Sequence, residues 1–238
     1  MRNNNYLFEK DFEVRYEDID LNCKCKITSI LKYLQEIAIM HGEGLGNGVL
    51  DLAEKKIAWV LMEWDVQIYK YPSYKSKVNI KTWTNGIEGL YSYRQFELFD
   101  ERENVIAVAT AKWILMDIEK RRPMRIPEEL IDVYGYDERK LLPNSNIKLQ
   151  DTENVDSSFE YKVQKRDIDT NGHVNNVNQV EFILEGLPDG IVIKNMKVVY
   201  KNEIKHGEIL QISTTKINEN EYVSTIKSNK TNCIIKIS

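Results

Sequence analysis

Three polar side chains in the last third of the chain have types and spacing that could support chemistry. They are Asp169, Asn171 and His173 in the segment DIDTNGHVNN. In an extended or gently curled loop, residues at i, i+2 and i+4 point to one side, so we expect all three to meet one ligand. A carboxylate can hold a water while an amide and an imidazole orient the reacting groups. Gly172 would let a substrate approach the backbone closely.

A helical pattern follows this segment and adds a second element of the same chemistry. The free backbone N–H groups and the positive dipole end of a helix N-terminus can polarise a carbonyl oxygen. Together, the loop and the helix start indicate an ester or thioester hydrolase. A second interpretation is structural: Asp167, Asp169 and Asn171 would also suit Asx turns in a polar loop that leads into a helix.

Two other kinds of site agree less well with the sequence. A metal site could be built from Asp169, His173 and His206, but no two histidines have the helical spacing of common zinc motifs. A cysteine nucleophile would need a nearby histidine. Cys23 and Cys25 lie in the half of the chain that lacks one at the matching position, and Cys233 lies in the last expected strand.

The chain contains an internal repeat at an offset of 149 residues, which aligns 12–27 with 161–176. The copies differ where chemistry could reside: Lys24 matches His173, and Glu203 falls opposite Tyr71 or Pro72. Five aligned positions are identical, at Val14, Asp18, Ile19, Asp20 and Asn22. We therefore expect shared residues to serve the fold and His173 and Glu203 to mark a site in the second copy.

Each copy shows a strand, a polar loop, one helix and then several strands. The helical periods use Ile27, Ile30, Leu31, Leu34, Ile37 and Ala38 in the first copy and Val177, Val180, Ile183 and Leu184 in the second. Strand-like runs cover 57–69, 77–83, 90–99 and 105–117, then 192–201, 208–216, 221–227 and 233–237. We predict an α+β protein with an N-terminal repeat at 1–130, a linker at 131–158 and a C-terminal repeat at 159–238, and we expect the two units to pair.

Composition limits the class of protein further. With 238 residues, 42% apolar residues and a formal charge of −4, the chain can fold around a core and has no global attraction for nucleic acid. No apolar run approaches the roughly 20 residues of a membrane span, and the N-terminus does not resemble a secretory signal. We expect a cytoplasmic protein with reduced thiols. The tryptophans at 59, 64, 83 and 113 suit a sheet core or the lining of an apolar tunnel.

Several blocks, in order, resemble the acyl-acyl carrier protein (acyl-ACP) thioesterase family of plants and bacteria. They are ITSILKYLQEIAIMH, AWVLMEWDVQIYKYPSYKSKVNIKTW, VATAKWILMDIEKRRPMRIPEEL and DIDTNGHVNNVNQVEFILEGLP. The resemblance covers nearly the whole chain. It implies a double-hotdog fold, which is two fused repeats of a long helix wrapped by an antiparallel sheet.

The resemblance also implies a reaction and a set of site residues. The reaction is hydrolysis of fatty acyl-ACP to free fatty acid and holo-ACP, which terminates fatty acid synthesis, without a cofactor or metal beyond the substrate's own phosphopantetheine arm. The family's catalytic positions fall on Asp169, Asn171, His173 and Glu203. Many plant members have a cysteine after that glutamate, where this chain has Ile204. We therefore expect direct attack by water activated by Glu203, alone or with Asp169.

Acyl carrier proteins are acidic, and the turn EKRRPMRIPEEL offers a local basic patch on an acidic chain. The patch consists of Lys120, Arg121, Arg122 and Arg125, and a solvated turn explains it equally well. A further homodimer is compatible with the sequence. The alternatives to an acyl-ACP thioesterase are an acyl-CoA thioesterase, a hotdog hydratase and a noncatalytic acyl-binding protein.

Overall fold

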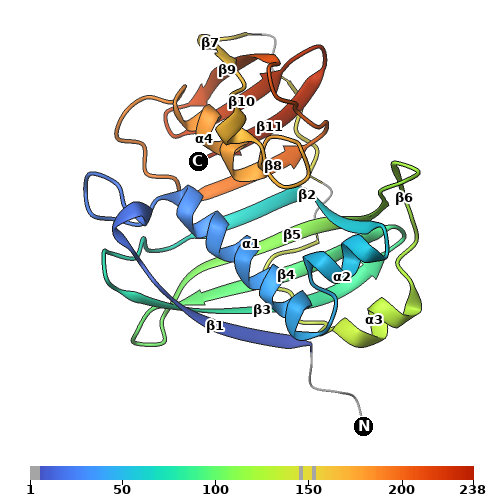
Figure 1. Ribbon diagram of the computed structural model, residues 1–238. Helices are drawn as coiled ribbons and strands as arrows, with labels where there is room; N and C mark the ends of the chain where they lie inside the picture. The colour runs from blue at the N-terminus through green and yellow to red at the C-terminus, as the bar shows by residue number, and fades with distance from the viewer. Residues whose placement is uncertain (1–5, 145–146, 152–153) are drawn as a thin grey trace. The chain divides into compact units, whose positions relative to one another are not determined.

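The computed structural model describes residues 6–144, 147–151 and 154–238. The chain divides into two compact units. Unit 1 comprises Met1–Met62 and Val66–Asn144, and unit 2 comprises Glu63–Asp65 and Ser145–Ser238. Each unit contains one principal helix and an antiparallel sheet, as the repeat in the sequence predicts (Figure 1).

Unit 1 has a sheet in the order β1-β3-β4-β5-β2, with β6 paired to β5. Helix α1 begins where predicted, and the apolar residues of its helical period are buried except Ala38, which is partly exposed. It lies along one face of this sheet and packs against β1 and β3 (Figure 1). The elements are β1 (Leu7–Glu13), a 3₁₀ turn (Tyr16–Asp18), α1 (Ile27–Gly44), α2 (Val49–Glu54), β2 (Ile57–Ile68), β3 (Lys77–Glu88), β4 (Tyr91–Phe99), β5 (Val105–Asp117), β6 (Arg122–Pro123) and α3 (Glu128–Tyr134).

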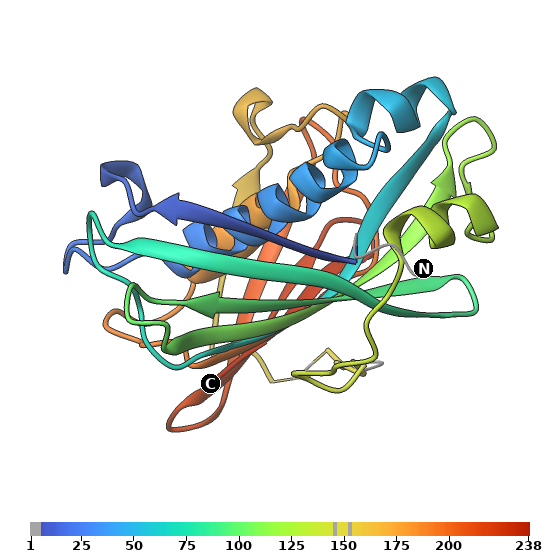
Figure 2. The same ribbon diagram turned by 90° about the horizontal axis from the view of Figure 1, so that it is seen from below.

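The chain that follows α3 covers the opposite face of the unit 1 sheet (Figure 2). The Trp83 indole donates to the carbonyl of Arg139 at 3.1 Å. Buried Gln95 accepts from the backbone N–H groups of Leu141 and Leu142 and donates to the Leu142 carbonyl. These bonds satisfy the polar groups of a segment that has no regular structure of its own.

Unit 2 repeats the plan on shorter strands, in the order β8-β11-β10-β9-β7. Helix α4 packs against β9, β10 and β11. The elements are β7 (Ser157–Lys162), a 3₁₀ turn (Lys165–Asp167), α4 (Asn176–Leu184), β8 (Asn195–Tyr200), β9 (Ile209–Asn218), β10 (Glu221–Lys227) and β11 (Thr231–Ile237).

The prediction of an α+β double-hotdog fold is confirmed, and the structure adds two short helices that the sequence analysis missed. Helix α2 has six residues and α3 has seven, and α3 crosses the expected boundary between the first repeat and the linker at residue 130. Among the four tryptophans, Trp64 and Trp83 are fully buried. Within the described residues, no helix is long and apolar enough to cross a membrane.

Candidate active site

The loop before each principal helix is built in the same way in both units. The first aspartate of the shared Asp-Ile-Asp is buried, and its carboxylate closes a 3₁₀ turn. Asp18 Oδ2 accepts from the Arg15 backbone N–H at 2.9 Å, and Asp167 Oδ2 accepts from that of Gln164 at 2.7 Å. The Tyr161 hydroxyl also donates to Asp167 Oδ2 at 2.8 Å. This aspartate is common to both copies because it holds the loop.

The second aspartate of the motif closes the next turn. Asp169 Oδ1 accepts from the backbone N–H of Asn171 at 2.8 Å and lies 3.5 Å from that of His173. In unit 1, Asp20 Oδ1 accepts from the backbone N–H groups of Asn22 and Lys24 at 2.8 and 2.9 Å. One carboxylate oxygen of Asp169 therefore organises the loop, as Asp20 does in the copy that lacks the histidine.

Of the two loop shapes expected, extended or gently curled, the structure has neither a straight nor a gently curved segment: residues 169–172 form a tight turn. The Gly172 N–H donates to the Asp169 carbonyl at 3.1 Å, and the Asp169 N–H donates to the His173 carbonyl at 2.8 Å. Gly172 has φ +80°, and Cys23 adopts φ +56° at the matching position. The glycine thus serves a left-handed turn conformation, which costs glycine less than other residues.

The turn presents His173 to a carboxylate that is distant in the sequence. His173 Nε2 lies 3.0 Å from Glu203 Oε2, and the side chains are 26% and 52% exposed. A half-exposed pair of this kind can contact a substrate and water. Asn171 is exposed on the same turn. The structure therefore brings His173 and Glu203 together and places Asp169 and Asn171 beside them on the loop.

Matching hydrogen bonds settle which residue of unit 1 corresponds to Glu203. The Val174 N–H donates to the Ile204 carbonyl at 2.8 Å, and the Cys25 N–H donates to the Pro72 carbonyl at 2.8 Å. Ile204 thus corresponds to Pro72, and Glu203 to Tyr71. Unit 1 has no acid–imidazole pair at this place. Its Lys24 donates instead to Ser73 Oγ at 2.9 Å.

Helix α4 starts directly after the loop, where the helical pattern in the sequence predicts it. Asn175 is the N-cap, and its side chain accepts from the Val177 N–H at 2.8 Å. The Asn178 side chain donates back to the Asp167 carbonyl at 3.1 Å. These bonds fix the positive end of the helix dipole next to the turn that carries His173.

The three thiols offer no activated nucleophile beside this pair. Burial raises the pKa of Cys25 to about 12, and burial also raises the pKa of Cys233 well above its usual range. Cys23 is exposed, but it lies on the unit 1 loop. Within 6–144, 147–151 and 154–238, no group of three or more His, Cys, Asp or Glu side chains is arranged to hold a metal ion.

The predicted basic patch is an exposed turn between β5 and α3. Lys120, Arg121, Arg122 and Arg125 are all exposed. Lys120 Nζ lies 3.0 Å from Asp117 Oδ2, which partly neutralises the turn. The backbone N–H of Lys120, and then its side chain, hold the pKa of Asp117 below its usual value.

Comparison with known proteins identifies the family along almost the whole chain. A family model described as the acyl-ACP thioesterase N-terminal domain matches residues 5–134, and one described as the C-terminal domain matches residues 150–237. The chain is 28% identical over 242 residues to oleoyl-acyl carrier protein thioesterase 2 of Arabidopsis thaliana, with 93% of this chain and 66% of the relative covered. It is 25% identical over 228 residues to a dodecanoyl-[acyl-carrier-protein] hydrolase of Cinnamomum camphora, with 88% and 59% covered. The chain thus spans slightly less than two thirds of the length of these curated relatives.

Solved structures support the same fold. The chain matches an acyl-ACP thioesterase of Bacteroides thetaiotaomicron with a TM-score of 0.89 at 22% identity, covering 100% of this chain and 99% of the other. It matches the 12:0-ACP thioesterase of Umbellularia californica with a TM-score of 0.87 at 20% identity, covering 98% and 96%.

Proposed function

The chain belongs to the acyl-ACP thioesterase family, and from that premise we propose that it hydrolyses fatty acyl-ACP thioesters to free fatty acid and holo-ACP. The observation that carries the proposal is the contact of 3.0 Å between His173 Nε2 and Glu203 Oε2, which has no counterpart in unit 1. The names of the relatives agree with this reaction class and span oleoyl, palmitoyl and dodecanoyl chains.

In the proposed mechanism, Glu203 is the general base. Its carboxylate takes a proton from a bound water while the water oxygen forms a bond to the thioester carbonyl carbon. His173 donates an Nε2–H to Glu203 Oε2 and holds the carboxylate in one orientation. The tetrahedral intermediate then collapses, the carbon–sulfur bond breaks, and the leaving thiolate of the phosphopantetheine arm takes the proton from Glu203.

Two further groups serve the oxyanion and the loop. The exposed Asn171 amide and the N-terminal N–H groups of α4 stabilise charge that develops on the carbonyl oxygen. Asp169 keeps the turn in shape through Oδ1, because that oxygen already accepts from the Asn171 N–H and lies close to the His173 N–H. Attack by water requires neither a thiol nor a metal ion, and the thiol at the position after the glutamate is replaced by Ile204.

Recognition of the carrier protein is assigned to the basic patch of Lys120, Arg121, Arg122 and Arg125. The proposal is supported by the exposure of all four cationic residues on one turn of an acidic chain. The double reversal Arg121→Glu/Arg122→Glu should raise KM for acyl-ACP at low salt and leave KM for a small acyl thioester unchanged. An equal change in both constants would mean that the turn acts on the fold and not on the carrier.

The experiment that tests the proposed activity is thiol release from acyl-ACP of several chain lengths, with the same acyl chains on coenzyme A alongside. Faster release from ACP supports the proposal, and faster release from coenzyme A would assign an acyl-CoA thioesterase. Acyl binding without release of thiol would indicate a binding protein. Sedimentation of the purified chain tests the proposed homodimer, and cell fractionation tests the expected cytoplasmic location.

A further inference from the structure

A β-bulge occurs at the same place in both units. In β11, Thr231 pairs with Lys227 and Cys233 pairs with Ile226, so Asn232 is the extra residue. In β5, Val105 pairs with Phe99 and Ala107 pairs with Leu98, which leaves Ile106 as the extra residue. Both extra side chains are buried, at 0% and 1% exposure. Bulges next to active sites often re-aim one side chain.

The backbone of the bulge does the same work in each unit. The Asn232 carbonyl accepts from the N–H groups of Lys201 and Asn202 at 2.7 and 3.2 Å. The Ile106 carbonyl accepts from the N–H groups of Tyr69 and Lys70 at 2.8 and 3.1 Å. Lys201 and Asn202 of unit 2 therefore correspond to Tyr69 and Lys70 of unit 1. The residue that follows Asn202 is Glu203.

The side chains of the bulges differ. Asn232 Nδ2 donates to the Glu203 carbonyl at 3.1 Å, and Asn232 Oδ1 accepts from the Ser228 N–H at 2.8 Å. Ile106 can make neither bond. The amide therefore stands in the unit that has the histidine–glutamate pair, and a hydrocarbon stands in the unit that lacks it.

The backbone around Glu203 is consequently held on both sides. The Asn232 amide binds the carbonyl of Glu203, and the Val174 N–H binds the carbonyl of Ile204, the next residue. The second bond comes from the residue that follows His173. Glu203 lies outside the regular strands, so these two bonds substitute for a sheet ladder at this point.

We propose that Asn232 is a positioning residue, whose buried amide holds the Glu203 backbone so that its carboxylate reaches His173. The inference rests on the proposed function of Glu203 as the base. A misplacement of about 1 Å at a reacting group can cost roughly 10²-fold in rate. Loss of the amide should therefore lower kcat while acyl-ACP still binds.

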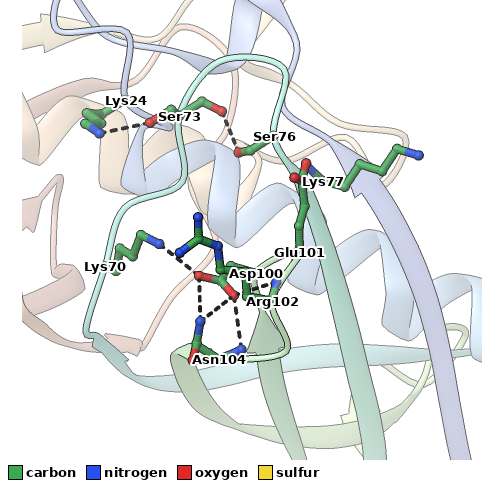
Figure 3. A network of polar contacts seen from close by, with 9 residues as sticks. All are labelled: Lys24, Lys70, Ser73, Ser76, Lys77, Asp100, Glu101, Arg102 and Asn104. Atoms are coloured by element: carbon green, nitrogen blue, oxygen red, sulfur yellow. Dashed lines mark hydrogen bonds and ion pairs between the residues drawn. The ribbon is translucent and has the colours of Figure 1, made fainter.

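A purely structural explanation of Asn232 is that its amide closes the hairpin turn through the bond from the Ser228 N–H. Unit 1 closes the corresponding turn in another way. There, Asp100 accepts from the backbone N–H groups of Arg102 and Asn104, both at 3.0 Å, and from Lys70 Nζ at 2.8 Å (Figure 3). The carboxylate of Asp100, whose side chain is 15% exposed, thus closes the turn while the bulge side chain stays apolar. The bond from Asn232 to Glu203 has no counterpart in that arrangement.

The test is Asn232→Ile, which installs the residue that the chain itself uses at the matching bulge. We expect kcat for acyl-ACP to fall by about 10- to 100-fold, with KM changed less than about twofold. Asn202→Ala is the matched control, because its amide donates to the Thr231 carbonyl at 2.6 Å in the same hairpin and not to Glu203. The control should keep kcat within about twofold.

A double variant separates positioning from general loosening. In the Glu203→Gln background, Asn232→Ile should cause no further loss of the residual rate, because the group that it positions is already disabled. A loss of the same size in both backgrounds would overturn the inference, and so would a normal kcat for Asn232→Ile. If Glu203→Gln itself keeps a normal kcat, the proposed function of Glu203 fails first and the inference with it.

Asn232→Asp keeps the test valid if the isoleucine variant does not fold. It retains the size of the side chain and an acceptor for the Ser228 N–H but loses the donor toward the Glu203 carbonyl. The folded Asn232→Asp protein should show the same fall in kcat, and a normal kcat would again overturn the inference.

Discussion

Substitution of Asp169 tests whether its carboxylate organises the loop or acts as the base. In the structure, Asp169 Oδ1 accepts from the Asn171 N–H at 2.8 Å and lies 3.5 Å from the His173 N–H. Asparagine offers an oxygen in the same place, whereas alanine offers none. Asp169→Asn should therefore keep kcat within about 10-fold, and Asp169→Ala should lose about 10² because the turn that carries His173 shifts.

The stability change of Asp169→Ala follows from the bonds that it removes. A backbone hydrogen bond to a carboxylate contributes about 1.5 to 3 kcal/mol, and only the bond at 2.8 Å has good length. Asp169→Ala should thus cost about 2 kcal/mol. Asp20→Ala removes two such bonds, at 2.8 and 2.9 Å, from the unit 1 loop. It should cost at least as much stability as Asp169→Ala, without the same loss of kcat.

The assay is steady-state thiol release from acyl-ACP, read together with chemical unfolding of each variant. The reasoning is refuted if Asp169→Asn is as inactive as Glu203→Gln while its stability stays near that of the wild type. That result would mean that the negative charge of Asp169 takes part in the chemistry.

Three further predictions follow from the structure. His173→Ala should lower kcat by about 10²-fold or more, whereas Lys24→Ala at the matching position of unit 1 should leave kcat unchanged, as thiol release would show. A thiol reagent at pH 8 should label only Cys23 quickly in the folded protein, because Cys25 and Cys233 are buried; rapid labelling of three thiols would contradict this. Burial raises the pKa of Asp18, but the nearby Tyr33 hydroxyl and the hydrogen bonds from Arg15 outweigh it and hold the pKa below its ordinary value of 3.8. The stability that Asp18 contributes is therefore full above that value and lost as the pH falls, so Asp18→Asn should flatten the acid side of a plot of unfolding free energy against pH.

Most of the fold could be predicted from the sequence because its signals are periodic and occur twice. The apolar spacing from Ile27 to Ile37 predicts α1, and the β-branched runs predict the long strands. Helices α2 and α3 were missed because they have six and seven residues, which is too short for a helical period to stand out.

The residues of the candidate site could be predicted from the sequence, but the role of each residue could not. Asp169 and His173 are equally prominent in the motif, and only the hydrogen bonds show that Asp169 Oδ1 is engaged as Asp20 Oδ1 is. The sequence alignment places either Tyr71 or Pro72 opposite Glu203, and the matching hydrogen bonds of the two units assign Tyr71. Asn232 could not be found, because a bulge depends on the register between two strands and not on either strand alone.

The central claim is that Glu203, oriented by His173, activates the water that cleaves an acyl thioester. Its most direct test is single-turnover thiol release from acyl-ACP by the wild type and by Glu203→Gln, which keeps an oxygen within reach of His173. We predict that the variant loses about 10²- to 10⁴-fold in rate with unchanged stability and unchanged binding of acyl-ACP. A variant that releases thiol at nearly the wild-type rate would contradict the account.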